Sequence, residues 1–307
     1  MSLARSILLR ASRSTWLAEQ FRRRAFGRRA VRRFMPGEDV ESAYAAAREL
    51  GDGGLGTVFT NLGERTTTAE QAAAVHAHYR DVIDAIGRLA LPAHVSVKLT
   101  HLGLAVDRDA CLAAVVDLAK RAESIGSMLW VDMEESEYVD ATLTLYREAR
   151  LASPRVGVCL QAYLRRTPAD LDTLLALDPA IRLVKGAYRE PKEIAFEKKR
   201  ETDAAYLELA ERLLDTAAAR RAFAVFGTHD IALLSRIGEA AATRNVSREA
   251  WEVHMLYGIR TGDQRALASR GVAVRVLISY GENWFPWYMR RLAERPANVW
   301  FVVKNLW

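Results

Sequence analysis

The chain has 307 residues, half of them hydrophobic, and a formal net charge of +6 at pH 7. It contains no run of about eighteen apolar residues, which excludes a membrane-spanning helix and predicts a soluble protein. No linker rich in proline, glycine or serine interrupts it, so we expect one large domain.

The positive charge is concentrated at the N-terminus. Residues 1–33 contain ten arginines and one acidic residue, Glu19, so this segment carries +9 and leaves −3 for the remainder. Because arginine favours helices and long basic faces usually meet water, we predict a solvated basic helical arm over residues 1–48. An arm that contacts anionic lipid at the inner face of the cell membrane, an arm that contacts an acidic partner, and a transit peptide are the alternatives.

Residues 51–56 read Gly-Asp-Gly-Gly-Leu-Gly and match the spacing of a dinucleotide-binding loop. Such a loop must follow a strand and open a helix, because the pyrophosphate sits on the helix N-terminus. Here a helical pattern precedes the segment and a strand pattern follows it. We therefore interpret the segment as the turn from a helix into the first strand.

Short runs of β-branched and aromatic residues then alternate with longer helical patterns. Eight strands, each followed by a helix, in about 250 residues predict an α/β fold of the (β/α)₈ barrel type. A doubly wound open sheet is the alternative. The predicted strands cover residues 57–60, 94–98, 128–132, 156–160, 182–184, 222–227, 251–254 and 272–278.

The two cysteines, Cys111 and Cys159, stand among apolar residues in a predicted helix and a predicted strand. Both are expected to be reduced core residues, which is typical of a cytoplasmic protein. The six histidines are scattered and lack a metal-binding spacing, so no metal site is predicted.

Polar residues stand where the predicted strands end, and in a barrel these ends carry the catalytic groups. Several such residues converging on one mouth predict a small-molecule site. A surface position or a helix cap is the alternative for any one of them. The main residues at the strand ends are Lys98, Asp132, Gln161, Arg182, Tyr188, Thr228 and His229.

The predicted helix over residues 286–294 carries two adjacent arginines, Arg290 and Arg291, followed by Glu294. Two neighbouring guanidinium groups can clamp a small carboxylate through parallel charge-assisted hydrogen bonds. Glu294 lies one turn after Arg290, where its carboxylate can hold the guanidinium. A solvated helix with one surface ion pair is the alternative.

In chain order, these segments resemble those of the proline dehydrogenases of the monofunctional bacterial type. The resemblance runs from about residue 31 to the C-terminus, and its most specific parts are Leu-Val-Lys-Gly-Ala-Tyr and the Arg-Arg helix. The matching segments cover residues 95–100, 132–134, 161–163, 182–188, 226–230 and 290–294.

The resemblance implies a distorted (β/α)₈ barrel over residues 49–307, with the last helix over the mouth and FAD bound noncovalently. It implies oxidation of L-proline to pyrroline-5-carboxylate, the first step of proline catabolism to glutamate, by hydride transfer from C5 to flavin N5. The electrons would pass to a quinone or another membrane-linked acceptor.

The resemblance also assigns roles to residues. Arg290 and Arg291 would bind the proline carboxylate with Glu294 holding the clamp. Lys98 and Asp132 would form a polar floor as an ion pair, and Arg182 would lie near flavin N5, where a cation stabilises developing negative charge. Tyr188, Ala187 and Leu256 would pack on the pyrrolidine ring. The cofactor contacts would come from Met133, Gln161, Arg182, Val184, Gly186, Ala187, Tyr188, Thr228 and His229.

Leu277 and Trp287 depart from the family's pattern, because each stands where a tyrosine is usual beside the substrate. A preference for proline over hydroxyproline or another cyclic imino acid is therefore left open. Leu277 should disfavour a hydroxylated ring, since burying an unpaired hydroxyl costs ~1–3 kcal/mol. Tyr280 lies on the wrong strand parity to replace the missing hydroxyl.

Two other functions are possible on composition and alternation alone. A flavin barrel acting on folate would not need a paired-arginine clamp for a small amino acid. A nucleic-acid or membrane-surface binder acting through the basic arm would leave the strand-end residues without a role. We therefore expect an enzyme with no nucleic-acid partner, located in the cytoplasm, with peripheral contact at the cell membrane as an open alternative.

Overall fold

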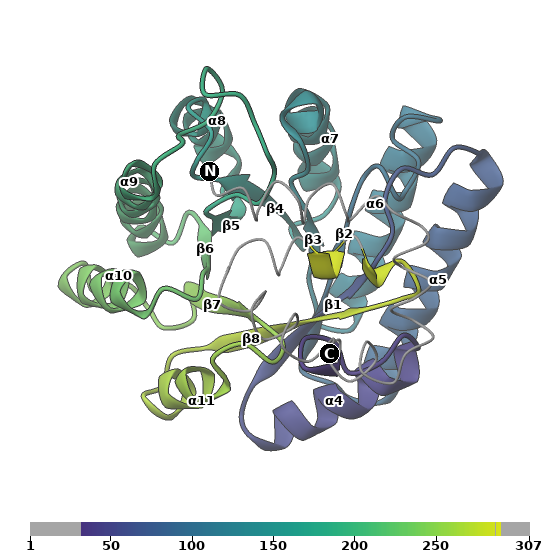
Figure 1. Ribbon diagram of the computed structural model, residues 1–307, viewed down its shortest axis with the longest axis horizontal. Helices are drawn as coiled ribbons and strands as arrows, with labels where there is room; N and C mark the ends of the chain where they lie inside the picture. The colour runs from purple at the N-terminus through teal and green to yellow at the C-terminus, as the bar shows by residue number, and fades with distance from the viewer. Residues whose placement is uncertain (1–31, 286, 290–307) are drawn as a thin grey trace, which may run out of the picture.

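The computed structural model describes residues 32–285 and 287–289 (Figure 1). Eight parallel strands form a closed barrel in the order β1 to β8, so the predicted barrel is confirmed and the open doubly wound sheet is wrong. The strands are β1 (Gly56–Asn61), β2 (Ala93–Val97), β3 (Leu129–Val131), β4 (Val156–Gln161), β5 (Ala180–Val184), β6 (Phe223–Gly227), β7 (Trp251–Leu256) and β8 (Val274–Tyr280).

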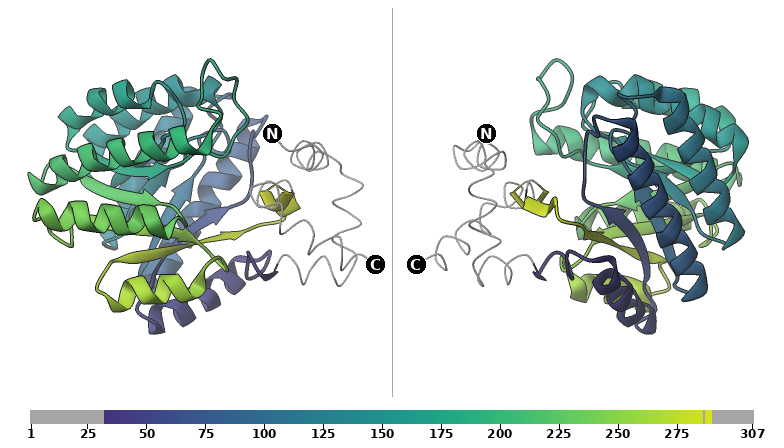
Figure 2. Two further views of the ribbon diagram at one scale, coloured as in Figure 1. Left: turned by 60° about the vertical axis from the view of Figure 1, so that its left-hand side comes forward. Right: turned by 90° about the vertical axis from the view of Figure 1, so that its right-hand side faces the viewer.

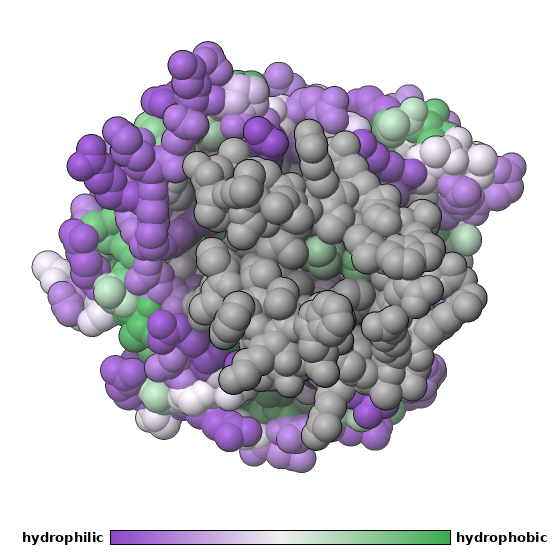
Figure 3. Space-filling model, viewed as in Figure 1, coloured by the Kyte–Doolittle hydropathy of each residue, from purple (hydrophilic) through white to green (hydrophobic). Residues whose placement is uncertain are grey.

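Helices form an outer ring around these strands (Figure 1). Hydrophilic side chains predominate around the rim of the face seen in Figure 3, as expected where the outer faces of helices meet water. The helices are α4 (Val40–Asp52), α5 (Ala69–Arg88), α6 (Arg108–Ser124), α7 (Val139–Ala152), α8 (Thr167–Leu174), α9 (Lys199–Ala218), α10 (Ile231–Thr243) and α11 (Thr261–Ser269), with 3-10 turns η1 (Ser136–Tyr138) and η2 (Leu175–Leu177).

Side-chain caps fix where several helices begin. The carboxylate of Asp39 accepts a hydrogen bond from the backbone of Ser42 at the start of α4, and Asp230 accepts one from the backbone of Leu233 at the start of α10. These caps satisfy N–H groups that have no partner within the helix. The cap at Asp230 also places that carboxylate at the carboxyl end of β6.

Helix α4 lies against the outside of the barrel and buries three alanines in the core, Ala43, Ala46 and Ala47. The expected boundary between arm and barrel at residue 48 falls inside this helix. Residues 1–31 of the predicted arm lie outside the described residues. Helix α4 ends at Asp52 and β1 begins at Gly56, so the glycine-rich segment is a turn from helix to strand, as predicted.

Alternation along each strand separates the barrel interior from the surrounding core. On β8, Leu277 and Ser279 face a cavity, whereas Val276, Ile278 and Tyr280 pack in the core outside the strands. The hydroxyl of Tyr280 hydrogen-bonds His78 on α5 at 2.9 Å. Tyr280 therefore lies on the opposite face from Leu277, as predicted from parity.

The last described residues lie at the carboxyl ends of the strands. Residues 284–285 and 287–289 are helical, and this segment follows β8 at the open end of the barrel (Figure 2). Trp287 lines the cavity there. The described part of the predicted last helix thus lies at the barrel mouth.

The two cysteines are both buried and free, in α6 and β4 as predicted. Within residues 32–285 and 287–289, no helix is both long and apolar enough to cross a membrane.

Candidate active site

A cavity of about 610 Å³ opens at the carboxyl ends of the strands. All the predicted site residues that the structure describes line this cavity. They are Lys98, Asp132, Met133, Gln161, Arg182, Val184, Gly186, Ala187, Tyr188, Thr228, His229, Leu256, Leu277 and Trp287. The remaining three, Arg290, Arg291 and Glu294, lie outside the described residues.

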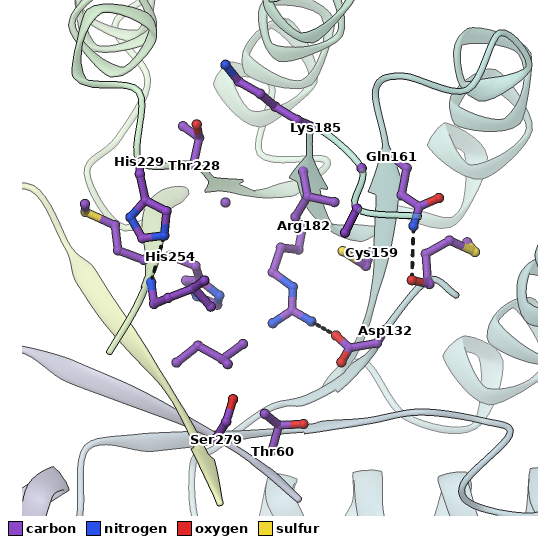
Figure 4. Close-up of a pocket in the computed structure, with 18 of the residues that line it drawn as sticks. Thr60, Asp132, Cys159, Gln161, Arg182, Lys185, Thr228, His229, His254 and Ser279 are labelled. Atoms are coloured by element: carbon purple, nitrogen blue, oxygen red, sulfur yellow. Dashed lines mark hydrogen bonds and ion pairs between the residues drawn. The ribbon is translucent and has the colours of Figure 1, made fainter. Parts of the chain in front are cut away.

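Asp132, at the end of β3, is the centre of the polar floor (Figure 4). The ammonium group of Lys98 lies 3.9 Å from its carboxylate, which confirms the predicted ion pair. Arg182 on β5 also pairs with this carboxylate, and the hydroxyl of Ser96 donates to it at 2.8 Å. One carboxylate is thus held by two cations, whereas the sequence predicted only one.

Arg182 is a buried cation whose charge is stabilised by its surroundings. Its side chain is 3% exposed, and its guanidinium carbon lies 5.3 Å from the centre of the Trp130 ring. Burial opposes the charge, but the neighbouring carboxylate of Asp132 raises the pKa of Arg182 above its ordinary value. Among the described residues, its Nη1 atom has no hydrogen-bond partner. Arg182 therefore presents a permanent positive charge and an unused donor at the cavity.

Gln161 ends β4 with its amide fixed in one orientation. Its Nε2 atom donates to the backbone carbonyls of Met133 at 3.2 Å and Glu134 at 3.3 Å. Because both partners are acceptors, the amide nitrogen must face them. The buried Oε1 atom has no hydrogen-bond partner in the described part of the chain. Gln161 thus offers an acceptor to a ligand in the cavity.

Two lysines and two aspartates form a charge cluster at the rim near β5 and β6. Lys185 donates to Asp203 at 2.6 Å and to Asp230 at 2.9 Å, and Lys199 pairs with the same two carboxylates. Burial opposes ionisation of Asp230, but the two lysines lower its pKa to about 2. The formal charges of the two lysines and the two aspartates therefore balance within the cluster.

The loop after β5 depends on Gly186. Its φ of +116° lies in a region that other residues rarely adopt, and a Cβ atom there would lie 2.1 Å from the ring of Tyr163. Only glycine allows the loop to pack this closely against Tyr163. This packing sets the path of Ala187 and Tyr188 along the cavity wall.

Below the cavity, three buried side chains cluster inside the barrel: His94 on β2 and Glu252 and His254 on β7. Their ligand atoms lie within 4.8 Å of one another, the arrangement of a metal site. However, Arg275 donates to both carboxylate oxygens of Glu252 at 3.0 Å. The charge of Glu252 is thus already balanced by a guanidinium, so we interpret the cluster as an ion-pair network.

His254 connects this network to the cavity. Its Nε2 atom donates to Glu252 at 2.7 Å, and its side chain also lines the cavity. Burial lowers the pKa of His254 to about 4, so the ring is neutral at pH 7. Burial alone would raise the pKa of Glu252, but the same hydrogen bond from His254 and the charge of Arg275 lower it to about 2.

Comparison with known proteins gives the family. The profile of the proline dehydrogenase family matches residues 43–304. The chain belongs to the proline dehydrogenase family. It is 33% identical to proline dehydrogenase 2 of Bacillus subtilis subsp. natto over 100% of this chain and 99% of that protein. It is 32% identical to the proline dehydrogenase of Deinococcus radiodurans over 89% of each chain.

Solved structures of larger proteins share the barrel. Proline utilization A (PutA) from Bdellovibrio bacteriovorus, inactivated by N-propargylglycine, aligns with a TM-score of 0.79 at 22% identity, covering 87% of this chain and 32% of that one. A PutA mutant from Bradyrhizobium japonicum aligns with a TM-score of 0.70 at 26% identity, covering 84% and 30%. The chain spans about a third of the length of these proteins, and the likeness to the Bdellovibrio protein concerns the fold.

Several cavity residues are absent from the sequence prediction. The alternation of inward and outward residues along a strand could have predicted two of them. Ser279 shares the inward face of β8 with Leu277, and His254 shares that of β7 with Leu256. Cys159, predicted only as a core residue, lines the cavity as well. Lys185, Gly227 and Asp230 belong to the predicted strand-end segments, although no role was assigned to them. The lining residues outside the prediction are Thr60, Leu62, Cys159, Lys199, His254, Met255, Arg260 and Ser279.

Proposed function

We propose that the protein is an FAD-dependent proline dehydrogenase that oxidises L-proline to pyrroline-5-carboxylate. In this proposal the electrons pass to a quinone or another membrane-linked acceptor, and the protein acts in the cytoplasm or against the inner face of the cell membrane. The observation that carries it is the buried Arg182, paired with Asp132 beside Lys98 at the floor of a strand-end cavity, in a chain of this family.

The residues of the cavity fit a flavin. Its volume of about 610 Å³ lies in the range of cofactor and ligand sites. The buried Oε1 of Gln161 and the buried Nη1 of Arg182, each without a hydrogen-bond partner in the described chain, offer an acceptor and a donor to the polar edge of an isoalloxazine ring. When bound, FAD would supply the hydride acceptor, which no amino-acid side chain provides.

The protein's own residues would position the substrate and balance charge. The fixed cation of Arg182 favours negative charge that develops beside it, and it acts more strongly in a dry cavity than in water. The ion pair of Asp132 with Lys98 holds the polar floor. Leu256 and Leu277 give an apolar wall against which a small ring can be oriented.

The test is an absorbance spectrum of the purified protein before and after anaerobic addition of L-proline. We expect a bound flavin whose band bleaches with L-proline. Arg182→Met should slow the reduction roughly 10²-fold, by analogy with removal of one stabilising donor at developing charge. Arg108→Met is the matched control, because Arg108 is a half-exposed surface arginine paired with Glu148 on the outer helices.

Two results would contradict the proposal. Protein that contains no flavin and takes up none when FAD is added would refute the cofactor. Bound flavin that L-proline does not reduce would refute the substrate. Equal rates of flavin reduction in wild type and Arg182→Met would be compatible with the proposed reaction. They would refute the proposal that Arg182 accelerates it.

A further inference from the structure

The loop between β5 and α9, residues 185–198, forms part of the cavity wall. Ala187 and Tyr188 line the cavity near the start of this loop. Two residues after Tyr188, the carboxylate of Glu190 binds Ser136 in the segment that follows β3. One carboxylate oxygen accepts a hydrogen bond from the backbone N–H of Ser136 at 2.8 Å, and the other accepts one from its hydroxyl at 2.6 Å. We call these two hydrogen bonds the Glu190–Ser136 bridge.

The bridge connects two segments that both reach the cavity. Ser136 begins the 3-10 turn η1, four residues after Asp132 at the end of β3. Strand β4 lies between β3 and β5 in the barrel, so the bridge joins the loops on the two sides of β4. It also gives a partner to the N–H group at the start of η1, where the side chain of Glu135 makes no capping bond. The cavity wall at Tyr188 is therefore tied to the segment that carries the polar floor.

Other hydrogen bonds hold the two ends of the loop from a different side. Near the start of the loop, the N–H of Tyr163 donates to the carbonyl of Lys185 at 2.9 Å. Near its end, the N–H of Phe196 donates to the carbonyl of Tyr163 at 2.8 Å. Both ends are thus attached to the segment after β4. The Glu190–Ser136 bridge holds the middle of the loop from the segment after β3, so the part of the loop that lines the cavity is held from both sides.

The bridge is of a kind that restricts motion. An ionised carboxylate forms stronger hydrogen bonds than a neutral acceptor does, and here both of its oxygens bind one residue. Glu190 and Ser136 are each half-buried, which reduces competition from water. A wall that is fixed before the substrate arrives lowers the entropy lost on binding and orients the substrate.

We propose that Glu190 is a positioning residue, which through its bridge to Ser136 fixes Ala187 and Tyr188 against the ring of bound L-proline. The inference rests on the proposed function, which supplies the ring that these two side chains would contact. Glu190 does not itself line the cavity, so it acts through the loop. Arg182 is held separately, by Asp132 and by the hydroxyl of Ser96 at 2.8 Å. Loss of the bridge should therefore weaken substrate binding more than it slows hydride transfer.

The test measures the rate of anaerobic flavin reduction against the concentration of L-proline. Glu190→Ala should raise the half-saturating concentration at least about tenfold, while the limiting rate changes less than about threefold, as expected when substrate and transition state lose the same interaction. Glu190→Gln should restore the half-saturating concentration to within about threefold of wild type. Its amide oxygen can still accept from the N–H of Ser136, and its amide nitrogen can donate to the hydroxyl.

Glu193→Ala is the matched control. Glu193 lies in the same loop, is 67% exposed and lies 3.9 Å from the exposed Lys192, so its loss should change neither constant. Ser136→Ala removes one of the two hydrogen bonds and should raise the half-saturating concentration less than Glu190→Ala does. The double variant of Glu190→Ala with Ser136→Ala should bind L-proline no worse than Glu190→Ala alone, because the two residues act as one unit.

Hydrogen exchange without substrate tests the bridge apart from the reaction. The backbone N–H of Ser136 donates to Glu190, so the peptide that contains residue 136 should exchange faster in Glu190→Ala than in wild type. Glu193→Ala should exchange as the wild type does. Equal exchange in all three proteins would show that the bridge does not hold these segments.

The kinetic outcomes separate a positioning role from a structural one. An unchanged half-saturating concentration in Glu190→Ala would refute the inference. A fall in flavin content and limiting rate with no separate effect on the half-saturating concentration would mean that Glu190 only supports the fold. Wild-type flavin that L-proline does not reduce would refute the proposed function, and with it the substrate assigned to this wall, even where hydrogen exchange confirms the bridge.

Discussion

The interior of the barrel contains polar side chains at two levels. The two levels differ in whether their buried polar atoms have hydrogen-bond partners within the protein. At the lower level, Glu252 accepts hydrogen bonds from His254 and Arg275, and the Nε1 atom of Trp130 donates to His94. At the cavity level above, two to four residues further along the strands, the hydroxyl of Ser279, the Nη1 atom of Arg182 and the Oε1 atom of Gln161 have no hydrogen-bond partners in the described chain. The lower level is paired within the protein except at the Nδ1 atom of His254, whereas the upper level leaves several unpaired atoms facing the cavity.

This difference distinguishes groups that support the fold from groups that serve a ligand. Buried polar atoms are normally paired, so unpaired atoms grouped around one cavity indicate a binding site. Sites of this kind are expected to reduce the stability of the protein without its ligand. His254 belongs to both levels, because its Nε2 atom is bound to Glu252 while its ring lines the cavity.

The largest expected loss of stability comes from removing Glu252, the central acceptor of the lower level. Glu252→Ala removes the counter-charge of Arg275 and the partner of His254, and we expect it to reduce the free energy of unfolding by roughly 3–5 kcal/mol. Urea denaturation of the purified protein measures this change. Asp172→Ala is the control, since Asp172 is 64% exposed in its pair with Arg212, and its loss should cost less than about 1 kcal/mol. A similar small loss in both variants would contradict a structural role for the lower level.

Lowering the pH should produce the next largest loss of stability. Burial lowers the pKa of both His254 and His101 to about 4, well below the ordinary value of 6.5. Between these values the unfolded chain binds protons that the folded chain does not, so stability falls as the pH falls from about 6.5 to about 4. Glu252, with its pKa lowered to about 2, adds a further loss between about pH 4.5 and pH 2. The pKa of Glu134, which burial raises, acts in the opposite direction.

We expect the free energy of unfolding to be lower at pH 5 than at pH 7 by on the order of 2–4 kcal/mol. Urea denaturation at the two pH values measures the difference. Burial also lowers the pKa of His94 and of His78, which act in the same direction. His101→Asn should reduce the pH dependence by removing one of these four histidines. Equal stability at pH 5 and pH 7 would show that the fold does not hold the histidines neutral.

The sequence predicted the fold well because the alternation of strand and helix is a local pattern. All eight predicted strands are present, and their polar ends predicted most of the cavity wall. The ion pair of Lys98 with Asp132 was implied by the family resemblance, and the structure shows that the two residues follow neighbouring strands. These features depend on periodicity and on the rule that strand ends meet at the barrel mouth.

Contacts across the barrel interior could not be predicted in this way. The pairing of Arg182 with Asp132 joins residues on β5 and β3, and that of His94 with Glu252 joins β2 and β7. Which inward side chains meet depends on the register of all eight strands. The adjacency of Thr60 and Ser279 depends on the closure of β1 against β8, which brings together residues from the two ends of the barrel sequence.

The smallest expected effect is also the one that separates the two levels most clearly. Ser279→Ala removes a buried hydroxyl that lacks a partner in the described structure, so it loses no hydrogen bond and leaves a less polar wall. We expect the ligand-free protein to be unchanged or stabilised by up to about 1 kcal/mol in this variant, measured by thermal and urea unfolding. The hydroxyl of Thr60 interacts with the side chain of Tyr79, so Thr60→Val should instead be slightly destabilised.

The sign of the change for Ser279→Ala separates the two levels. A loss of more than about 1 kcal/mol would mean that the hydroxyl of Ser279 contributes to the fold, as the groups around Glu252 do. Unchanged or increased stability, in contrast with the loss expected for Glu252→Ala, would mean that this hydroxyl does not stabilise the folded chain. Its place on the cavity wall would then be explained by the molecule that binds there.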